Sequence, residues 1–521
     1  MAETALGRSP WPARALAVAA GGAAALTQPP FGFLPGLLGY ALLLALLDRA
    51  DPDRPNRSAL LRGWLAGCGY FAISLWWLTE PFQVDAPHQG WMAPFAVAIV
   101  TAGMALFWGV AALGYRFAGP KGVGRVLQFA GCLTLLEWLR GHILTGFPWD
   151  LPGETWPAGS PISQVAALVG AYGLTWITLT IASAPAVIRE GWAGRATVGV
   201  ALAALAGLYG FGAERLAGMP PAGPDAPMLR VVQANVRQES KYDPAIFNSI
   251  IARYVALTER PAARRPDVVI WPEGAIPAAF EDYLAPGTWT QQAVVGALSP
   301  GQSLILGGYR VGNGAVSPPV IFNSLAVLRR EGDQLALTGL YDKFRLVPFG
   351  EFLPFDALAG RLGIKTFVHV GDGFTPGPRP RPMSPPGLPA FQPLICYEAL
   401  YPGFTREGAI ATGKRPAWIV NISNDAWFGA TSGPLQHLNI ASYRAIEEGL
   451  PMVRATPTGV SAVIDAAGRP TARLGEGVFG IIDRPLPPAL APTPFSRWGD
   501  LPLLAMLLIS LVPIGLRWRR A

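Results

Sequence analysis

Three short segments of the sequence contain the residue types that acyl transfer needs. "VVIWPEGAIP" places Glu273 directly after an apolar run, "YDKFRLVPFGEFLP" contains Lys343 and Glu351, and "PLICYEALYP" contains Cys396. A thiol must lose its proton before it attacks a carbonyl carbon, and a carboxylate within hydrogen-bonding reach can accept that proton. A nearby ammonium stabilises the oxyanion that forms and lowers the thiol pKa. The segments together predict that Glu273, Lys343 and Cys396 form one catalytic group.

Cys396 is the cysteine for which a function is easiest to argue. The other two cysteines, Cys68 and Cys132, lie within long apolar runs, where a small soft side chain packs without difficulty. Burial as a packing residue is the usual state of a single cysteine, and that alternative stays open for Cys396. An unpaired thiol in an oxidising compartment favours a functional role instead.

The histidines offer no obvious base for this thiol. His88 and His142 lie in short loops between apolar runs, and neither His369 nor His437 lies in a segment with a catalytic pattern. We therefore expect a carboxylate, rather than an imidazole, to take the thiol proton.

Composition favours a membrane protein. Of 521 residues, 51% are hydrophobic and only 14% are charged. Most of the long apolar runs are close to the roughly 20 residues that span a bilayer, and we interpret all of them as transmembrane helices. The first run resembles the core of a signal peptide but lacks a convincing cleavage site, so we expect it to be retained. The eight runs are 16–27, 31–47, 63–79, 91–115, 126–136, 162–188, 196–213 and 501–516.

The basic residues between these runs predict the orientation. With both termini in the cytoplasm, the inside loops contain fourteen lysines and arginines, whereas the short outside loops contain one, Arg140. Lys and Arg in short loops remain on the cytoplasmic side of a membrane. The lysines and arginines of the cytoplasmic loops thus account for the net charge of +7. We therefore expect no nucleic-acid partner.

The segment between the seventh and eighth runs has a different pattern. Short apolar runs bounded by turns predict strands, and two longer patterns, at 244–260 and 434–450, predict helices. The predicted strands are 228–236, 267–271, 303–309, 322–328, 391–397, 418–423 and 459–465. Such a mixture favours layered sheets and helices, with Glu273 at the carboxyl end of a strand, where α/β sites gather.

The predicted organisation has three parts. Residues 1–218 form a membrane domain of seven helices, residues 219–490 an extracytoplasmic α/β domain, and residues 491–521 a last transmembrane helix with a basic tail. Pro- and Gly-rich stretches at 217–227 and 484–494 join the parts, and 371–389 is a proline-rich surface loop.

The three catalytic segments, in this order and separation, resemble the Glu-Lys-Cys motifs of the nitrilase superfamily, whose fold is an αββα sandwich. With seven helices before that domain and one after it, the whole chain resembles the apolipoprotein N-acyltransferase family. "NISNDAWFG" at 421–429 is also similar to a motif of that family. The resemblance implies transfer of the sn-1 acyl chain of a glycerophospholipid, typically phosphatidylethanolamine, to the α-amino group of a diacylglyceryl-cysteine that begins a bacterial lipoprotein.

The resemblance also implies roles for individual residues. Cys396 would be the nucleophile that becomes a thioester, Glu273 the general base, and Lys343 the cation beside the oxyanion. Glu351 would orient the lysine or serve the acid and base steps. The supporting or substrate-binding residues that the family pattern adds are Tyr397, Glu398 and Trp427.

The membrane part contains one further segment that resembles the family, "EWLRGHILTGFPW". Glu137 at a helix end is costly in lipid unless it is paired, and Arg140 one turn later is its expected partner. The sequence then continues "DLPGETW" where the family has a more apolar stretch, which puts the substrate-contacting role of this loop in doubt.

The expected enzyme is a monomer of the bacterial inner membrane. Its expected partners are a phospholipid donor, a diacylglyceryl apolipoprotein acceptor and the bilayer, and no metal or organic cofactor is required. Two alternatives stay open: a membrane-anchored amidase of the same superfamily, and a lipid-binding or transport protein with an inactive catalytic domain.

Overall fold

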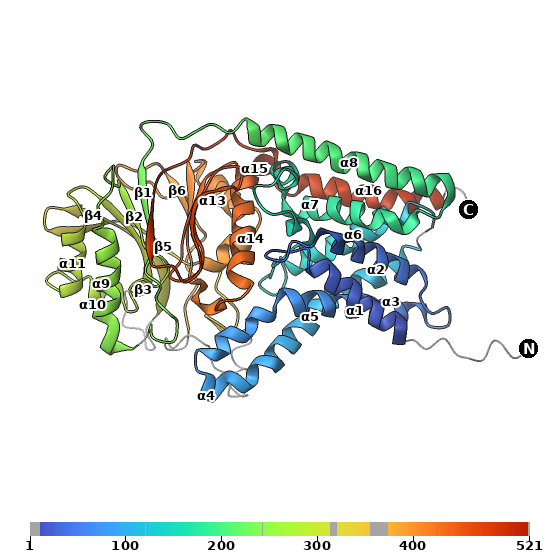
Figure 1. Ribbon diagram of the computed structural model, residues 1–521, viewed down its shortest axis with the longest axis horizontal. Helices are drawn as coiled ribbons and strands as arrows, with labels where there is room; N and C mark the ends of the chain where they lie inside the picture. Colours follow the sequence, from blue (N-terminus) through green and yellow to red (C-terminus); the bar gives the residue numbers. More distant parts are fainter. Residues whose placement is uncertain (1–10, 120, 242, 313–319, 355–372, 519–521) are drawn as a thin grey trace, which may run out of the picture. The chain divides into compact units, whose positions relative to one another are not determined.

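The computed structural model describes residues 11–119, 121–241, 243–312, 320–354 and 373–518. His369 and the first two residues of the predicted loop 371–389 lie outside these ranges. The chain divides into two compact units (Figure 1). The helical unit comprises Met1–Phe82, Ala86–Ala217 and Trp498–Ala521, and the sheet unit comprises Gln83–Asp85 and Gly218–Arg497.

Each of the eight predicted apolar runs falls on helical segments of the helical unit. The α-helices are α1 (Trp11–Ala25), α2 (Leu38–Asp48), α3 (Pro55–Ser74), α4 (Ala86–Gln89), α5 (Ala93–Phe117), α6 (Arg125–Arg140), α7 (Ala166–Ser183), α8 (Gly191–Ala217) and α16 (Leu501–Trp518). The 3-10 turns are η1 (Leu34–Leu37), η2 (Trp76–Gln83), η3 (Gly90–Met92), η4 (Pro152–Thr155), η5 (Ile162–Val165) and η6 (Ala184–Val187). Within the described residues, three helical segments are long and apolar enough to cross a membrane, namely Ala86–Phe117, Ile162–Val187 and Gly191–Ala217.

Small residues let helices α1, α3 and α5 pack closely. A Cβ atom added at Gly67 of α3 would lie 2.8 Å from the Cα of Ala105 in α5, and one added at Gly21 of α1 would overlap the carbonyl of Ala66 in α3. Both glycines therefore sit where backbones approach directly, which is how apolar helices without large side chains gain packing energy.

The predicted pairing of Glu137 is confirmed. Both side chains of the Glu137–Arg140 ion pair are fully buried, and Trp108 Nε1 donates a second hydrogen bond to Glu137 Oε1 at 2.6 Å. The polar loop that follows is also internal, since the Tyr70 hydroxyl donates to the Asp150 carbonyl at 2.7 Å and Glu154 Oε2 accepts from the Leu151 N–H at 3.1 Å. These contacts give the unexpected polar sequence of the loop a packing role inside the helical unit.

The sheet unit contains two sheets. The strands are β1 (Met228–Gln233), β2 (Val268–Ile270), β3 (Ser303–Val311), β4 (Ile321–Glu331), β5 (Gln334–Asp342), β6 (Phe391–Ile395), β7 (Trp418–Ile422), β8 (Met452–Ala455), β9 (Ser461–Ile464), β10 (Pro470–Leu474) and β11 (Gly480–Pro485). The first sheet has the order β11-β1-β2-β3-β4-β5, and the second has the order β10-β9-β8-β7-β6. Strands β1, β2 and β3 are parallel to one another, as are β6, β7 and β8.

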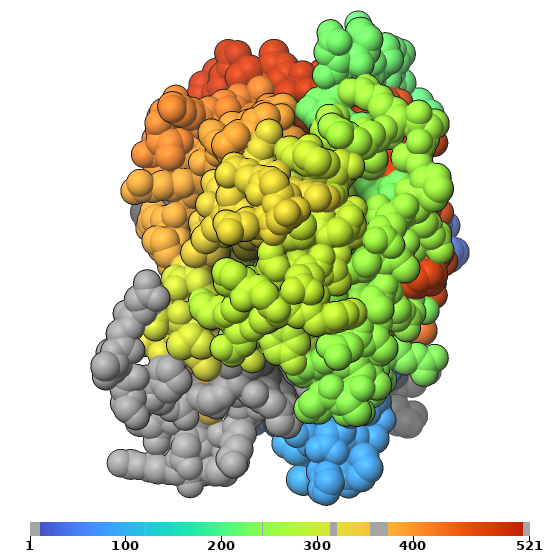
Figure 2. Space-filling view, turned by 90° about the vertical axis from the view of Figure 1, so that its left-hand side faces the viewer, coloured from blue at the N-terminus to red at the C-terminus, as the bar shows by residue number. Residues whose placement is uncertain are grey.

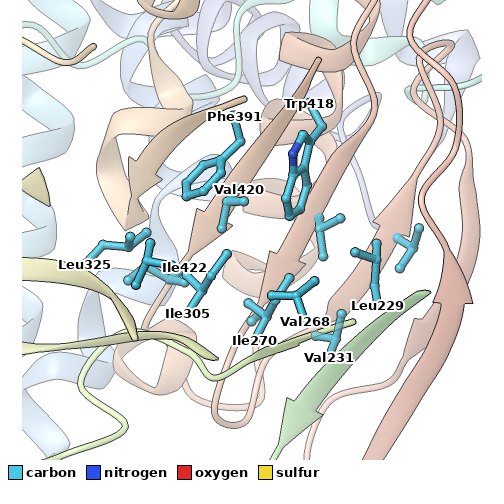
Figure 3. Close-up of a cluster of buried hydrophobic side chains, with 14 of the residues drawn as sticks. Leu229, Val231, Val268, Ile270, Ile305, Leu325, Phe391, Trp418, Val420 and Ile422 are labelled. Atoms are coloured by element: carbon cyan, nitrogen blue, oxygen red, sulfur yellow. The ribbon is translucent and has the colours of Figure 1, made fainter. Parts of the chain in front are cut away.

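The core lies between the two sheets and follows the two-residue period of the strands. Val268 and Ile270 of β2 face the second sheet, whereas Val269 and Trp271 face the outer helices. Figure 3 shows Val268 and Ile270 across from Trp418 and other apolar side chains of the second sheet. Because both faces of these strands are buried, their sequences are nearly continuous apolar runs.

Helices cover the outer face of each sheet (Figure 1). The first sheet is covered by α9 (Phe247–Thr258), α10 (Phe280–Tyr283) and α11 (Trp289–Ala297), and the second by α13 (Phe404–Thr412) and α14 (Gly433–Glu448). Figure 2 shows the green-to-yellow surface on this side of the molecule. The short segments η7 (Pro244–Ile246), η8 (Cys396–Leu400), η9 (Asp425–Phe428) and α15 (Pro494–Trp498) complete the described elements. The predicted αββα sandwich is thus confirmed.

The sequence interpretation missed four strands, β5, β8, β10 and β11. β5 and β10 lie at sheet edges, where one face is partly exposed and the apolar pattern is broken. β8 has only four residues and includes the charged Arg454, which is buried.

Candidate active site

The predicted site residues meet at one edge of the two sheets. Glu273 follows β2, Lys343 follows β5 and Cys396 follows β6. β5 is antiparallel to β4, which is antiparallel to β3, so β5 runs in the same direction as β2. Carboxyl ends of parallel strands face a common side of a sheet, which is where sites of α/β proteins form.

Cys396 stands at a sharp turn between β6 and η8. Its φ angle is 50°, a left-handed conformation that side chains other than glycine seldom adopt. Such backbone strain persists where the surrounding structure holds it, and it concentrates at functional sites. The side chain is half-buried and free of any disulfide, so the turn presents the thiol beyond the end of its strand.

Lys343 joins two carboxylates in one buried cluster. Its Nζ lies 2.9 Å from Glu351 Oε1 and 3.3 Å from Glu273 Oε1. All three side chains are at most 9% exposed. Glu351 is fixed further, because its Oε2 accepts a hydrogen bond from the Val347 N–H at 2.8 Å. The cluster places one ammonium between two carboxylates at the end of β5.

Asn323 of β4 completes this cluster and was missed by the sequence interpretation. Its Nδ2 donates to Glu273 Oε1 at 2.7 Å and to Glu351 Oε1 at 2.8 Å. An amide that donates to both carboxylates sets their separation. The signal was present in the strand "IFNSLAVL", where an amide and a serine interrupt an apolar stretch.

The second oxygen of Glu273 is left for another proton donor. Glu273 Oε2 is buried and makes no hydrogen bond within the described part of the chain. A buried carboxylate oxygen without a donor is costly, and a hydrogen bond from another group would relieve that cost. The geometry thus suits Glu273 to proton transfer.

Burial raises the pKa of the Cys396 thiol to about 12, and the charge of Glu273 acts in the same direction. Lys343 and hydrogen bonding with Ser423 lower it. The predicted effect of Lys343 is therefore confirmed in direction, but burial outweighs it and the thiol pKa rises overall. At rest the sulfur is a thiol, so its attack needs a base.

Lys343 itself stays protonated. Burial opposes its charge, but Glu273, Glu351 and Cys396 together raise its pKa above the ordinary value. A permanently charged ammonium is suited to stabilise an oxyanion, and it is a poor proton donor.

Glu398 connects the segment of Cys396 to the segment of Lys343. Its Oε2 accepts from the Ile395 N–H at 2.8 Å, and its Oε1 accepts from the Tyr341 hydroxyl at 2.6 Å and the Phe344 N–H at 2.8 Å. Burial raises the pKa of Glu398 to about 7, although these hydrogen bonds oppose the shift. Glu398 positions both segments.

A second polar network near Cys396 joins Arg454 of β8, Asp425 of η9 and His437 of α14. Arg454 Nη2 lies 2.7 Å from Asp425 Oδ2, and His437 Nδ1 lies 3.0 Å from Asp425 Oδ1. Despite its burial, Asp425 has a pKa below its ordinary value because of Arg454 and His437. The His437 side chain hydrogen-bonds the Cys396 backbone, and burial followed by the charge of Arg454 lowers the pKa of His437. His437 therefore supports the strained turn as a neutral ring.

The remaining predicted residues lie nearby with less direct contacts. Tyr397 is buried and packs edge-on against Tyr401, with ring centroids 5.4 Å apart. Trp427 lies in η9 and is half-exposed. Their supporting roles stay predictions. Among the described residues, no group of three or more His, Cys, Asp or Glu side chains is arranged to hold a metal ion.

Comparison with known proteins shows which family the chain belongs to. Residues 20–184 match the model of the apolipoprotein N-acyltransferase N-terminal domain, and residues 229–491 match that of carbon-nitrogen hydrolases. The apolipoprotein N-acyltransferase of Caulobacter vibrioides is 56% identical over 96% of this chain and 94% of that protein. The chain belongs to the apolipoprotein N-acyltransferase family. It is accordingly an enzyme, an acyltransferase with a nitrilase-like catalytic domain.

More distant members of the apolipoprotein N-acyltransferase family match over the same span. The protein of Bradyrhizobium diazoefficiens is 37% identical over 96% of this chain and 94% of its own length. Among solved structures, an amidase from Nesterenkonia sp. matches 51% of this chain and 92% of its own, with 19% identity and a TM-score of 0.34.

Proposed function

We propose that the enzyme moves the sn-1 acyl chain of a glycerophospholipid to the α-amino group of the diacylglyceryl-cysteine of an apolipoprotein. Phosphatidylethanolamine is the proposed donor, and the transfer is the last step of bacterial lipoprotein maturation. The observation that carries the proposal is the grouping of Glu273, Lys343 and Cys396 in a chain of this family. We propose a ping-pong reaction through a thioester on Cys396.

In the first step Glu273 Oε2 takes the proton of the Cys396 thiol, and the sulfur attacks the carbonyl carbon of the sn-1 ester. The C–S bond forms as the carbonyl becomes an oxyanion, which Lys343 stabilises. The ester C–O bond then breaks, and the leaving oxygen takes the proton from Glu273. Lysophospholipid departs, and Glu273 is a carboxylate again.

In the second step the neutral α-amino group of the acceptor attacks the thioester carbonyl. Glu273 takes a proton from the nitrogen as the amide bond forms. The C–S bond breaks, and the sulfur regains its proton from Glu273. Water must be kept from the thioester throughout, and a water-poor pocket favours the amine.

The proposed setting is the bacterial inner membrane. We propose eight transmembrane helices, seven in residues 1–218 and one in residues 491–521, with both termini in the cytoplasm. Residues 219–490 then form a periplasmic catalytic domain, and the enzyme acts as a monomer. The distribution of Lys and Arg supports this topology, and both proposed substrates are anchored in the same bilayer.

A purified assay with defined substrates tests this function. A diacylglyceryl lipopeptide and phosphatidylethanolamine are incubated with the full-length enzyme, and N-acylated peptide and lysolipid are measured together. We expect the two products in equal amounts. Equal turnover with a donor that has no glycerol ester would contradict the donor assignment, and release of ammonia from small amides without any lysolipid would indicate an amidase instead.

A further inference from the structure

A second lysine, Lys241, reaches the same site from the segment after β1. Its side chain is 4% exposed. A Cβ atom added at Gly274 would collide with Lys241 Nζ, so the ammonium lies against the backbone of the residue that follows Glu273. Gly274 has a φ of 60°, a conformation that suits glycine and leaves the room that the ammonium occupies.

The partners of Lys241 are the reacting groups of the site. Its charge interacts with Glu273 and Cys396, and both interactions favour the protonated lysine. Its segment is tied to the second sheet as well, because Asn424 Nδ2 donates to Gln238 Oε1 at 2.9 Å and the Lys241 N–H donates to the Gln238 carbonyl. Lys241 is thus held at the site rather than extended toward solvent.

The buried cluster carries more negative than positive charge, and Lys241 can balance the difference. Glu273 and Glu351 share one ammonium, that of Lys343, which leaves one surplus negative charge in a buried place. Uncompensated buried charge is strongly unfavourable. When Glu273 takes the thiol proton, the surplus moves onto the sulfur and then onto the oxyanion. The surplus negative charge therefore remains in the site throughout the reaction, where it interacts with the ammonium of Lys241.

We propose that Lys241 is a positioning residue that supplies the second positive charge of the active site, balancing the surplus carboxylate at rest and the thiolate during reaction. The proposal rests on the proposed roles of Glu273 and Cys396. Lys343 stabilises the charge from the end of β5, and Lys241 stabilises it from the segment that follows β1.

Because Lys241 is buried, its charge depends on pH near neutrality. Burial lowers its pKa to about 8, against the opposing effect of Glu273 and Cys396. The second positive charge is therefore present below about pH 8 and lost above it. The reactivity of the thiol should reflect this loss even when no lipid is bound.

Alkylation of Cys396 by iodoacetamide tests the proposal without requiring acyl transfer. The rate is followed on the Cys396 peptide by mass spectrometry, in full-length protein, for wild type, Lys241→Met, Lys241→Arg and the exposed control Lys414→Met. At pH 7.5 we expect Lys241→Met to react about tenfold more slowly for each pKa unit by which its thiol rises. Lys241→Arg and Lys414→Met should react like wild type. The turnover number of Lys241→Met should fall while KM for the phospholipid is unchanged.

The dependence of the alkylation rate on pH provides a second readout. It compares wild type with Lys241→Arg and so does not require Lys241→Met to fold. Above pH 8 the wild-type alkylation rate should climb less steeply than that of Lys241→Arg, because arginine keeps its charge. A folded Lys241→Met that alkylates at the wild-type rate, or identical profiles for wild type and Lys241→Arg between pH 7 and 9, would overturn the proposal. Normal thiol chemistry in a wild type that transfers no acyl group would instead count against the proposed function.

Discussion

The ammonium of Lys343 lies closer to Glu351, at 2.9 Å, than to Glu273, at 3.3 Å. Glu351 therefore holds the lysine, and Asn323 holds both carboxylates apart. This arrangement leaves Glu273 Oε2 without a hydrogen-bond donor among the described residues, as the proposed transfer of the thiol proton requires. The two glutamates thus differ in their contacts, and the predictions below separate their proposed roles.

Replacing Glu351 should impair catalysis through the position of Lys343. In Glu351→Gln the lysine loses its nearer carboxylate and moves toward Glu273, where it competes for the base. Misplacement on this scale costs up to about 100-fold in rate. We expect the turnover number to fall with KM for the phospholipid unchanged, and Glu351→Asp to lie in between. An increase in KM alone would show that Glu351 binds substrate instead.

Replacing Glu273 should have a larger effect than replacing His437. Removal of a general base costs about 10²- to 10⁴-fold, so Glu273→Gln should lose nearly all transfer activity. His437→Gln removes a support of the Cys396 turn but no proton acceptor, and should retain most activity. Single-turnover assays of lysolipid release measure both. Loss of activity in His437→Gln, with activity kept in Glu273→Gln, would make the histidine the base.

Glu398 should matter for stability as well as for activity. Glu398→Gln replaces an acceptor oxygen with a donor, which leaves buried N–H groups near Ile395 or Phe344 unpaired. Each unpaired buried group costs about 1–3 kcal/mol. We expect a lower midpoint of thermal unfolding than in wild type, whereas Glu407→Gln, an exposed control on α13, should unfold like wild type. Equal midpoints for the two variants would exclude the positioning role.

The buried carboxyl group of Glu448 in α14 should make the stability of the fold depend on pH. Burial, followed by the charge of Glu447, raises its pKa to about 8. Its ordinary value is 4.5, so the folded state binds the proton more tightly than the unfolded state. The resulting stabilisation is complete below pH 4.5 and is lost as the pH rises to 8, an effect on the order of a few kcal/mol.

The matched variant for this effect is Glu448→Gln, which stays neutral. We expect its thermal midpoint to fall less than that of wild type between pH 5 and 8. The arginines that face the carboxyl group, Arg406 and Arg415, moderate the shift. Parallel curves for wild type and variant would contradict the assignment.

The sequence predicted the positions of site residues best where these residues directly follow a strand. Glu273 and Cys396 each follow an apolar run, so their place at the sheet edge was predictable from a pattern of a few residues. Lys343, which the structure places beside Glu273, was predicted although its strand, β5, was missed, because the motif around it is specific while an edge strand has a weak apolar pattern.

Other parts of the site depend on contacts between distant segments. Lys241 lies in the polar stretch "VRQESKYDPA", which has the composition of an exposed loop, and only the fold brings it to Glu273. Likewise, Asp425 follows β7 whereas Arg454 lies within β8, and their pairing depends on β7 and β8 being neighbours. Burial of the thiol, which raises its pKa against the lowering effect of Lys343, is also a property of the folded chain.

The central claim is that Cys396 carries the acyl chain. The purified enzyme is mixed with phosphatidylethanolamine without acceptor, and intact and peptide masses are recorded before and after hydroxylamine. We predict that wild type gains the mass of one acyl chain on the peptide with Cys396, that hydroxylamine removes it, and that Cys396→Ala gains nothing. Acylation of Cys396→Ala, or N-acylated product from a wild-type enzyme that never gains an acyl mass, would contradict the account.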